Sequence, residues 1–234
     1  MEVRQIKIEN IPAVIWGGGR DKVFIAVHGV QSNKQDEVIR LLSEQAVSKG
    51  YSVISFDLPE HGQRQCEQNT CKVQNCVSDL SKVMDYAKQR YEKISLFGCS
   101  LGAYVCLNAC KGEQIQQAVF LSPIVDMLQL VNGMLAYNKL SVGRLAEEKI
   151  IRTDSGQTLY WEDYCYITKN AIDNWSIKTD ILYTGNDNLQ SFKDISLFCD
   201  KFNCNLNFYV EGEHYFHTPE QLSYYERWLK SVII

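Results

Sequence analysis

The chain alternates between short apolar runs of strand length and longer segments in which apolar residues recur at helical spacing. Apolar and charged residues alternate near the start, which predicts an opening hairpin over residues 2–8 and 12–16. Continuous apolar runs, typical of strands buried on both faces, predict further strands at 23–27, 51–56, 94–97, 118–121, 181–183 and 206–210. This order is typical of an α/β protein with a mostly parallel sheet.

Helical periodicity fills most of the intervals between these strands. The segments 36–50, 76–91 and 103–109 each predict a helix. Another helix is expected between the last two strands, from the apolar stripe of Leu189, Phe192, Ile195 and Phe198. Thr218 followed by Pro219 is a start signal for a final helix. Helices are therefore available to cover both faces of the sheet.

The alternation breaks between Ser122 and about residue 175. This stretch is mostly helical in pattern and rich in tyrosine and tryptophan. With no repeat, low-complexity segment or proline-rich linker to divide the chain, we interpret it as a cap inserted at about 124–174 into a single domain spanning 1–234. Its aromatic residues Tyr160, Trp161 and Tyr164 could line a pocket, but at helical spacing they are expected to pack against the main domain.

Composition and charge narrow the function classes. With 234 residues, 45% of them hydrophobic and 22% charged, the chain can bury one sizeable core. Its net charge is −4 and its basic residues are dispersed, so nucleic acid is not an expected partner. No apolar run approaches the ~20 residues that span a bilayer, and the first residues lack the pattern of a signal peptide. We expect a cytoplasmic protein without stable membrane insertion.

Nine cysteines are present, an odd number without any Cys-x-x-Cys pair. Reduced thiols in a cytosol fit this usage best. The even spacing of Cys66, Cys71 and Cys76 raises a metal or redox cluster as an alternative. Zinc sites favour closer pairs and a second group of ligands, so we expect unpaired thiols and no metal.

The strongest chemical signal is Gly98-Cys99-Ser100-Leu101-Gly102. Gly-x-Ser-x-Gly is the pattern of a nucleophile elbow, a sharp strand-to-helix turn that presents a serine hydroxyl above the edge of a sheet. The bare pattern can arise by chance. Here it lies between the predicted strand 94–97 and the predicted helix 103–109, which is the context that the elbow requires. Ser100 is therefore the candidate nucleophile.

With this motif the chain resembles the α/β-hydrolase superfamily over nearly all its length, most of all its small esterases and the related lysophospholipase and serine aminopeptidase-like group. The loop His28-Gly29-Val30 after the third strand and the loop 57–62, Asp-Leu-Pro-Glu-His-Gly, also resemble family motifs. Glu60 stands where many members have Gly, and Cys99 where many have His. The resemblance implies an α/β-hydrolase fold with about eight strands, helices on both faces and a small helical cap.

A serine hydroxyl needs a base to accept its proton and a carboxylate to orient that base. Of the four histidines, His28 and His61 lie in loop motifs where they fix backbone geometry. The order Ser, acid, His of the family places the base after the last strand, where both His214 and His217 lie. The resemblance of 210–214 to the Gly-x-His loop of relatives favours His214, with His217 as the alternative.

The acid has two candidates as well. Asp187 follows the strand 181–183 in a Gly-x-Asp turn that resembles the usual family position. Asp126 follows the preceding strand, where some family members hold their carboxylate. The turn favours Asp187. The resemblance also implies an oxyanion hole formed by the backbone amides of Val30 and Leu101.

These residues predict a serine hydrolase that cleaves a small carboxylic ester through an acyl-enzyme, with no cofactor or metal. Aminopeptidase, thioesterase and lysophospholipase activities use the same residues and remain open, as does a catalytically silent binding protein. The expected partner is a small ester or acyl substrate. The acyl group, motion of the cap and the oligomeric state stay undetermined at this level.

Overall fold

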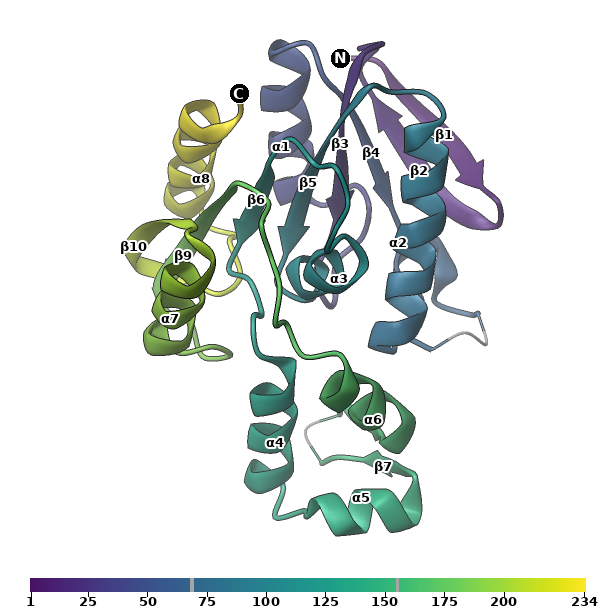
Figure 1. Ribbon diagram of the computed structural model, residues 1–234, viewed down its shortest axis with the longest axis vertical. Helices are drawn as coiled ribbons and strands as arrows, with labels where there is room; N and C mark the ends of the chain where they lie inside the picture. Colours follow the sequence, from purple (N-terminus) through teal and green to yellow (C-terminus); the bar gives the residue numbers. More distant parts are fainter. Residues whose placement is uncertain (68–69, 155) are drawn as a thin grey trace.

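A computed structural model describes residues 1–67, 70–154 and 156–234. Within them a central eight-stranded sheet has the order β1-β2-β4-β3-β5-β6-β9-β10 (Figure 1). The strands are β1 (Val3–Ile8), β2 (Ile11–Trp16), β3 (Lys22–Val27), β4 (Ser52–Phe56), β5 (Lys93–Cys99), β6 (Ala118–Leu121), β9 (Thr179–Asn186) and β10 (Asn205–Glu213). The pairings of β2 with β1 and with β4 are antiparallel and the other five pairings are parallel, so the predicted mostly parallel sheet is confirmed.

Helices cover both faces of this sheet because alternate side chains of each strand are apolar on both sides. In β3, Val23 and Ile25 belong to one core, and Phe24 belongs to the other. The first core is shared with α2 (Val73–Lys88), α3 (Leu101–Ala109) and α7 (Phe192–Phe202), and the second with α1 (Glu37–Ser48) and α8 (Pro219–Val232). In the described part of the chain, no helix is both long and apolar enough to cross a membrane.

The segment between β6 and β9 lies beyond the carboxyl ends of the central strands (Figure 1). Its elements are α4 (Met127–Tyr137), α5 (Val142–Glu148), β7 (Ile150–Arg152), β8 (Thr158–Tyr160) and α6 (Trp161–Lys169). They enclose a small core of Leu135, Leu145, Ile151 and Leu159. The sequence pattern missed the β7–β8 hairpin, since strands of three residues show no measurable periodicity.

Two aromatic residues of this segment pack within it. The Trp161 and Tyr164 rings stack with centroids 5.6 Å apart and contact the segment's own core. The expectation that they pack against the main domain is therefore wrong for these two. Tyr160, at the end of β8, instead lies under the ammonium group of Lys72, 5.0 Å from its ring centroid.

Two helix starts differ from the sequence expectation, each because of a capping contact. The helix predicted over 76–91 begins earlier, at Val73, whose amide donates to the Asp163 carboxylate of α6 over 2.8 Å. This cap comes from a residue 90 positions away, so no local signal announces it. Leu189 lies outside α7, which starts after Ser191, because the Ser191 hydroxyl accepts the Asp194 amide.

Candidate active site

Ser100 occupies a sharp turn between β5 and α3. Its backbone has φ 52° and ψ −117°, a conformation that is strained for any residue with a side chain. The Ser100 amide donates to the carbonyl of Leu121 in β6 over 3.0 Å, which fixes the turn to the neighbouring strand. The turn thus has the geometry of a nucleophile elbow at the carboxyl end of the sheet.

The glycines of the pentapeptide are required by close backbone contacts. A Cβ on Gly98 would lie 2.5 Å from the Cα of Ala103, and one on Gly102 would lie 2.2 Å from the carbonyl oxygen of Val27. Both distances are far below any real contact. Only glycine lets the start of α3 pack this closely on β3 and β5.

The structure brings Ser100, His214 and Asp187 together, although they lie far apart in the sequence. His214 Nε2 is 2.9 Å from the Ser100 hydroxyl oxygen, and His214 Nδ1 is 2.6 Å from Asp187 Oδ2. The Asp187 side chain is fully buried and that of His214 is 17% exposed. With Nδ1 donating to the carboxylate, Nε2 is free to accept the serine proton, which is the arrangement that general-base catalysis needs.

A loop after β9 holds the Asp187 carboxylate in place. Its Oδ1 accepts the amides of Leu189 at 2.8 Å and Gln190 at 3.2 Å, which leaves Oδ2 to His214. The Gln190 side chain in turn accepts the amides of Val125 and Asp126, each at 2.9 Å. Gln190 therefore links the loop after β9 to the loop after β6. Sequence reasoning missed it because no motif surrounds it.

The two alternative residues occupy other positions. Asp126 caps α4, where its Oδ1 accepts the Gln129 amide over 2.9 Å. The His217 ring donates from Nδ1 to the Tyr215 carbonyl and stacks on the Tyr215 ring, with its side chain 47% exposed. Neither is a hydrogen-bond partner of Ser100 or His214 within the described residues.

The backbone amides expected to form an oxyanion hole lie on either side of the serine. Leu101 is the first residue of α3, so its amide has no intrahelical acceptor and points out of the helix start. Gly29, which precedes Val30, approaches Ser100 so closely that an added Cβ would lie 3.2 Å from the serine Cβ. Across the described residues, neither the Leu101 nor the Val30 amide donates a hydrogen bond to another group of the protein.

The other two histidines tie the loops after β3 and β4 together. The His28 ring donates to the Gly29 carbonyl and accepts the Leu58 amide over 3.0 Å, and burial lowers its pKa to about 4. The His61 ring donates to the Pro59 carbonyl and accepts the Gln31 amide over 3.0 Å. Both imidazoles therefore act on loop geometry, as their motifs suggested.

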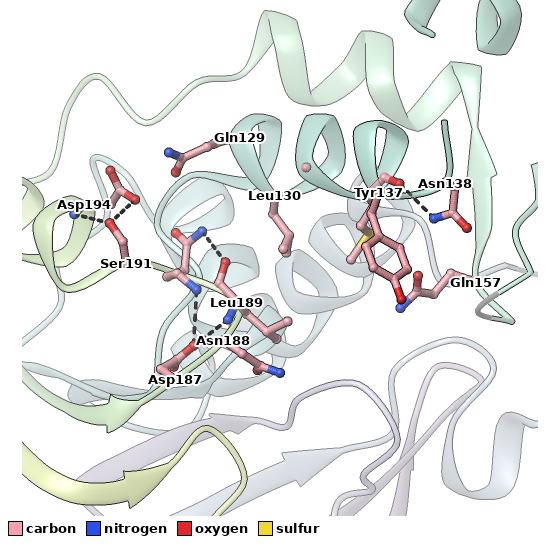
Figure 2. A pocket seen from close by; sticks show the side chains of 13 residues that line it. Gln129, Leu130, Tyr137, Asn138, Gln157, Asp187, Asn188, Leu189, Ser191 and Asp194 are labelled. Atoms are coloured by element: carbon pink, nitrogen blue, oxygen red, sulfur yellow. Dashed lines mark hydrogen bonds between the residues drawn. The ribbon is translucent and has the colours of Figure 1, made fainter. Parts of the chain in front are cut away.

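A cavity of about 680 Å³ lies between α4 and the loop after β9 (Figure 2). Leu130, Gly133 and Tyr137 line it from α4, and Asp187 and Leu189 line it from the loop. Its size is that of sites for small molecules. Asp187 is shared between the cavity lining and the Ser100 site, whereas Ser100 and His214 do not line the cavity.

The evenly spaced cysteines differ in their surroundings. Among the described residues, no three His, Cys, Asp or Glu side chains have an arrangement that could hold a metal ion. Cys66 is exposed, whereas the thiols of Cys71 and Cys76 approach each other to 3.7 Å.

Comparison with known proteins finds one matching family model. The family model described as serine aminopeptidase, S33, matches residues 18–155. Among curated proteins, none matches the sequence.

Solved structures share the fold at low sequence identity. A protein of Agrobacterium vitis S4 superposes with a TM-score of 0.80 at 17% identity, covering 100% of this chain and 99% of its own. Est1E from Butyrivibrio proteoclasticus with ferulic acid bound gives 0.78 at 18% identity, covering 97% and 96%. Mouse alpha/beta hydrolase domain-containing protein 10 gives 0.78 at 15% identity, covering 99% and 98%. The predicted α/β-hydrolase fold is confirmed.

Proposed function

The chain belongs to the serine aminopeptidase (S33) family of α/β serine hydrolases, and from this premise we propose that it cleaves a small carboxylic ester with Ser100 as nucleophile, His214 as base and Asp187 as acid. The observation that carries the proposal is the continuous relay of 2.9 Å and 2.6 Å contacts from the serine hydroxyl to the buried carboxylate.

The proposed mechanism gives each residue of the site a defined role. His214 Nε2 accepts the Ser100 proton as the oxygen attacks the ester carbonyl, and Asp187 stabilises the imidazolium that forms. The amides of Leu101 and Val30 donate to the developing oxyanion. His214 then returns the proton to the leaving alkoxide, and a water molecule activated by the same imidazole releases the acid. These steps require no cofactor or metal.

The lining of the cavity beside Asp187 favours binding of a small, largely uncharged group of the substrate. Leu130, Met134, Tyr137 and Leu189 give much of its wall an apolar character. Two aspartates line it: Asp187 has a fully buried side chain, and the Asp194 carboxylate accepts the Ser191 hydroxyl at 2.6 Å. An ester with a short or aryl acyl chain fits such a wall, and the ferulic acid bound by Est1E is an acid of this kind.

Aminopeptidase activity is the second candidate, because the family description names it. An amide would use the same nucleophile and base, so the two activities differ only in leaving group and in recognition of a terminal amine.

We also propose that the protein acts in the cytoplasm, since all nine cysteines are free thiols.

A fluorophosphonate probe tests the nucleophile directly. Folded wild-type protein should be labelled, and Ser100→Ala should abolish the labelling. Ser122→Ala is the matched control, because the Ser122 hydroxyl is buried without a hydrogen-bond partner among the described residues and lies just after β6. Unlabelled wild type, or labelling that survives in Ser100→Ala, would contradict the proposal.

A substrate panel then separates the two activities. Esters of p-nitrophenol with acyl chains of increasing length, the matching thioesters, and aminoacyl arylamides are compared by kcat/KM. A maximum at short-chain or aryl esters supports the ester hydrolase. Selective cleavage of arylamides would replace it with the aminopeptidase.

A further inference from the structure

Two thiols outside the hydrolase site lie next to each other at the start of α2. Cys71 lies two residues before the first residue of this helix, Val73, and Cys76 is the fourth residue of the helix. Their sulfur atoms are 3.7 Å apart. A disulfide bond is about 2.0 Å long, so the two sulfurs lie within about 2 Å of bonding distance.

The two thiols differ in the way that thiol–disulfide chemistry requires. A hydrogen bond from the Cys76 thiol, and then the neighbouring His61 imidazole, lower the pKa of Cys71 to about 6 against the opposing effect of burial. The contact with Cys71 and burial raise the pKa of Cys76. Cys71 is half-buried, whereas Cys76 has no exposed surface. The accessible thiol is therefore also the one that is readily a thiolate, the reactive form.

Independent contacts hold both cysteines in position. The Cys71 amide donates to the Glu60 carboxylate over 2.7 Å, which fixes the backbone before the helix. The Val73 amide donates to Asp163 over 2.8 Å, which fixes the first turn of α2. Because these bonds do not involve the sulfur atoms, they can persist while the thiols change their bonding.

We propose that Cys71 and Cys76 form a peroxide-sensitive dithiol that closes reversibly to a disulfide. The Cys71 thiolate attacks one oxygen of hydrogen peroxide, the O–O bond breaks, and the leaving hydroxide takes up a proton to form water. The resulting Cys71 sulfenic acid is attacked by the Cys76 sulfur, its S–O bond breaks, and a second water leaves. Overall, two thiols lose two electrons and two protons, and one peroxide is reduced to two water molecules.

The test follows the thiols of the whole folded chain by mass spectrometry. Reduced wild-type protein is treated with hydrogen peroxide up to a few equivalents, quenched with an alkylating reagent, digested without reductant and mapped. A Cys71–Cys76 disulfide that reverts on addition of dithiothreitol is the expected product. Cys71 that remains alkylated as a free thiol under these conditions would overturn the proposal.

Variants assign the two roles. In Cys76→Ser the sulfenic acid has no partner, so dimedone should label Cys71, whereas Cys71→Ser should lose dimedone labelling of this pair. Cys66→Ser is the matched control, because Cys66 is an exposed thiol of the same segment and its removal leaves the pair intact. Dimedone labelling of Cys66 in place of Cys71 in Cys76→Ser would refute the assignment. Circular dichroism melting verifies that each variant is folded.

Discussion

Replacing Asp187 with asparagine tests the proposed relay at its most buried point. The carboxylate accepts three hydrogen bonds: two backbone amides at 2.8 and 3.2 Å on Oδ1, and the His214 ring at 2.6 Å on Oδ2. Asparagine has one acceptor oxygen and one donor NH2 group in the same space. Whichever way the amide turns, the NH2 group faces a donor. Keeping the oxygen on the two backbone amides retains two bonds, so the NH2 group faces the His214 ring.

This orientation favours the wrong tautomer of the imidazole. With an NH2 group beside it, Nδ1 becomes the acceptor, and the proton moves to Nε2, which then cannot accept the Ser100 proton. In serine hydrolases with this relay, the equivalent change lowers kcat by about 10⁴-fold. That loss corresponds to about 5 kcal/mol of transition-state stabilisation. We expect a loss of this order in Asp187→Asn without a large change in folding, because the two backbone hydrogen bonds persist.

The rate of fluorophosphonate labelling is the assay, since it reports serine activation without a known substrate. Asp126→Asn is the control, because asparagine caps a helix as well as aspartate does and the Asp126 carboxylate accepts the Gln129 amide at the start of α4. It should label within about twofold of wild type. Asp187→Asn that labels within tenfold of wild type, or Asp126→Asn that loses labelling instead, would refute the reasoning.

Three further predictions concern the base, the capping carboxylate and the cavity. His214→Ala should slow fluorophosphonate labelling by at least about 10⁴-fold and His217→Ala by less than about twofold; equal losses would leave the base unassigned. Burial raises the pKa of Asp163 from 3.8 to about 6, so the Asp163 carboxyl holds its proton more tightly in the folded chain than in the unfolded chain. The free energy of unfolding therefore falls, by up to about 3 kcal/mol, as the pH rises from about 4 to about 6. In urea unfolding, Asp163→Asn should therefore be more stable than wild type at pH 7.5 and equally stable below pH ~4. Asp173→Asn, at an exposed site, is the control and should differ from wild type by the same amount at both pH values. A stability difference for Asp163→Asn that does not change with pH would contradict this prediction. Gly133 lines the cavity, and an added Cβ would meet nothing within 4 Å. Gly133→Phe should therefore lower kcat/KM about tenfold for esters with long acyl chains and little for acetate esters, with Gly133→Ala as the control. An equal loss of kcat/KM for all esters would place the acyl chain elsewhere.

Ser100 could be located from the sequence because the conformation of the nucleophile elbow is specified mainly by residues next to it. Its strained φ and its two close backbone contacts are imposed by neighbours within a few residues, or by the adjacent strand. Glycines at fixed offsets are therefore visible in the chain itself. The strand before the serine and the helix after it follow from hydrophobic period alone. Local geometry and local pattern agree here, and so the prediction needed no tertiary information.

The choice between His214 and His217 could not be made from periodicity. The pairing of β10 with β9 shifts register between Tyr209 and Glu213, so the strand contains an irregularity and extends beyond the predicted 206–210. Between these two pairs β10 advances four residues and β9 advances two, so the regular alternation of side chains is interrupted just before His214. The side-chain direction at 214 therefore depends on an irregularity that the sequence pattern does not reveal. Only resemblance to relatives favoured His214 beforehand.

The two acid candidates, Asp126 and Asp187, differ in how many backbone amides their carboxylate oxygens accept and in where those amides lie. Asp126 and Asp187 both follow strands that are neighbours in the sheet, β6 and β9, so strand position alone does not separate them. Asp126 begins a helix and caps it, whereas Asp187 lies in a loop that continues until the cap of α7 at Ser191. A carboxylate at a helix start accepts amides of its own helix. Asp187 keeps one oxygen for a distant partner because its loop amides occupy only the other.

The close approach of β9 and β10 explains how His214 reaches its partners. In the sheet, β10 is separated from β5, which carries Ser100, by β6 and β9. A Cβ on Gly185 would lie 2.2 Å from the carbonyl oxygen of Val210, so only glycine permits this contact between the two strand ends. Beyond the irregularity, Glu213 pairs with Asn186, directly before Asp187. The end of β10 is thereby held against the end of β9, which places His214 beside Asp187 and directs its ring toward the serine. The Gly-x-Asp turn at 185–187 thus serves the candidate site twice, once through its carboxylate and once through a glycine that admits the strand carrying the base.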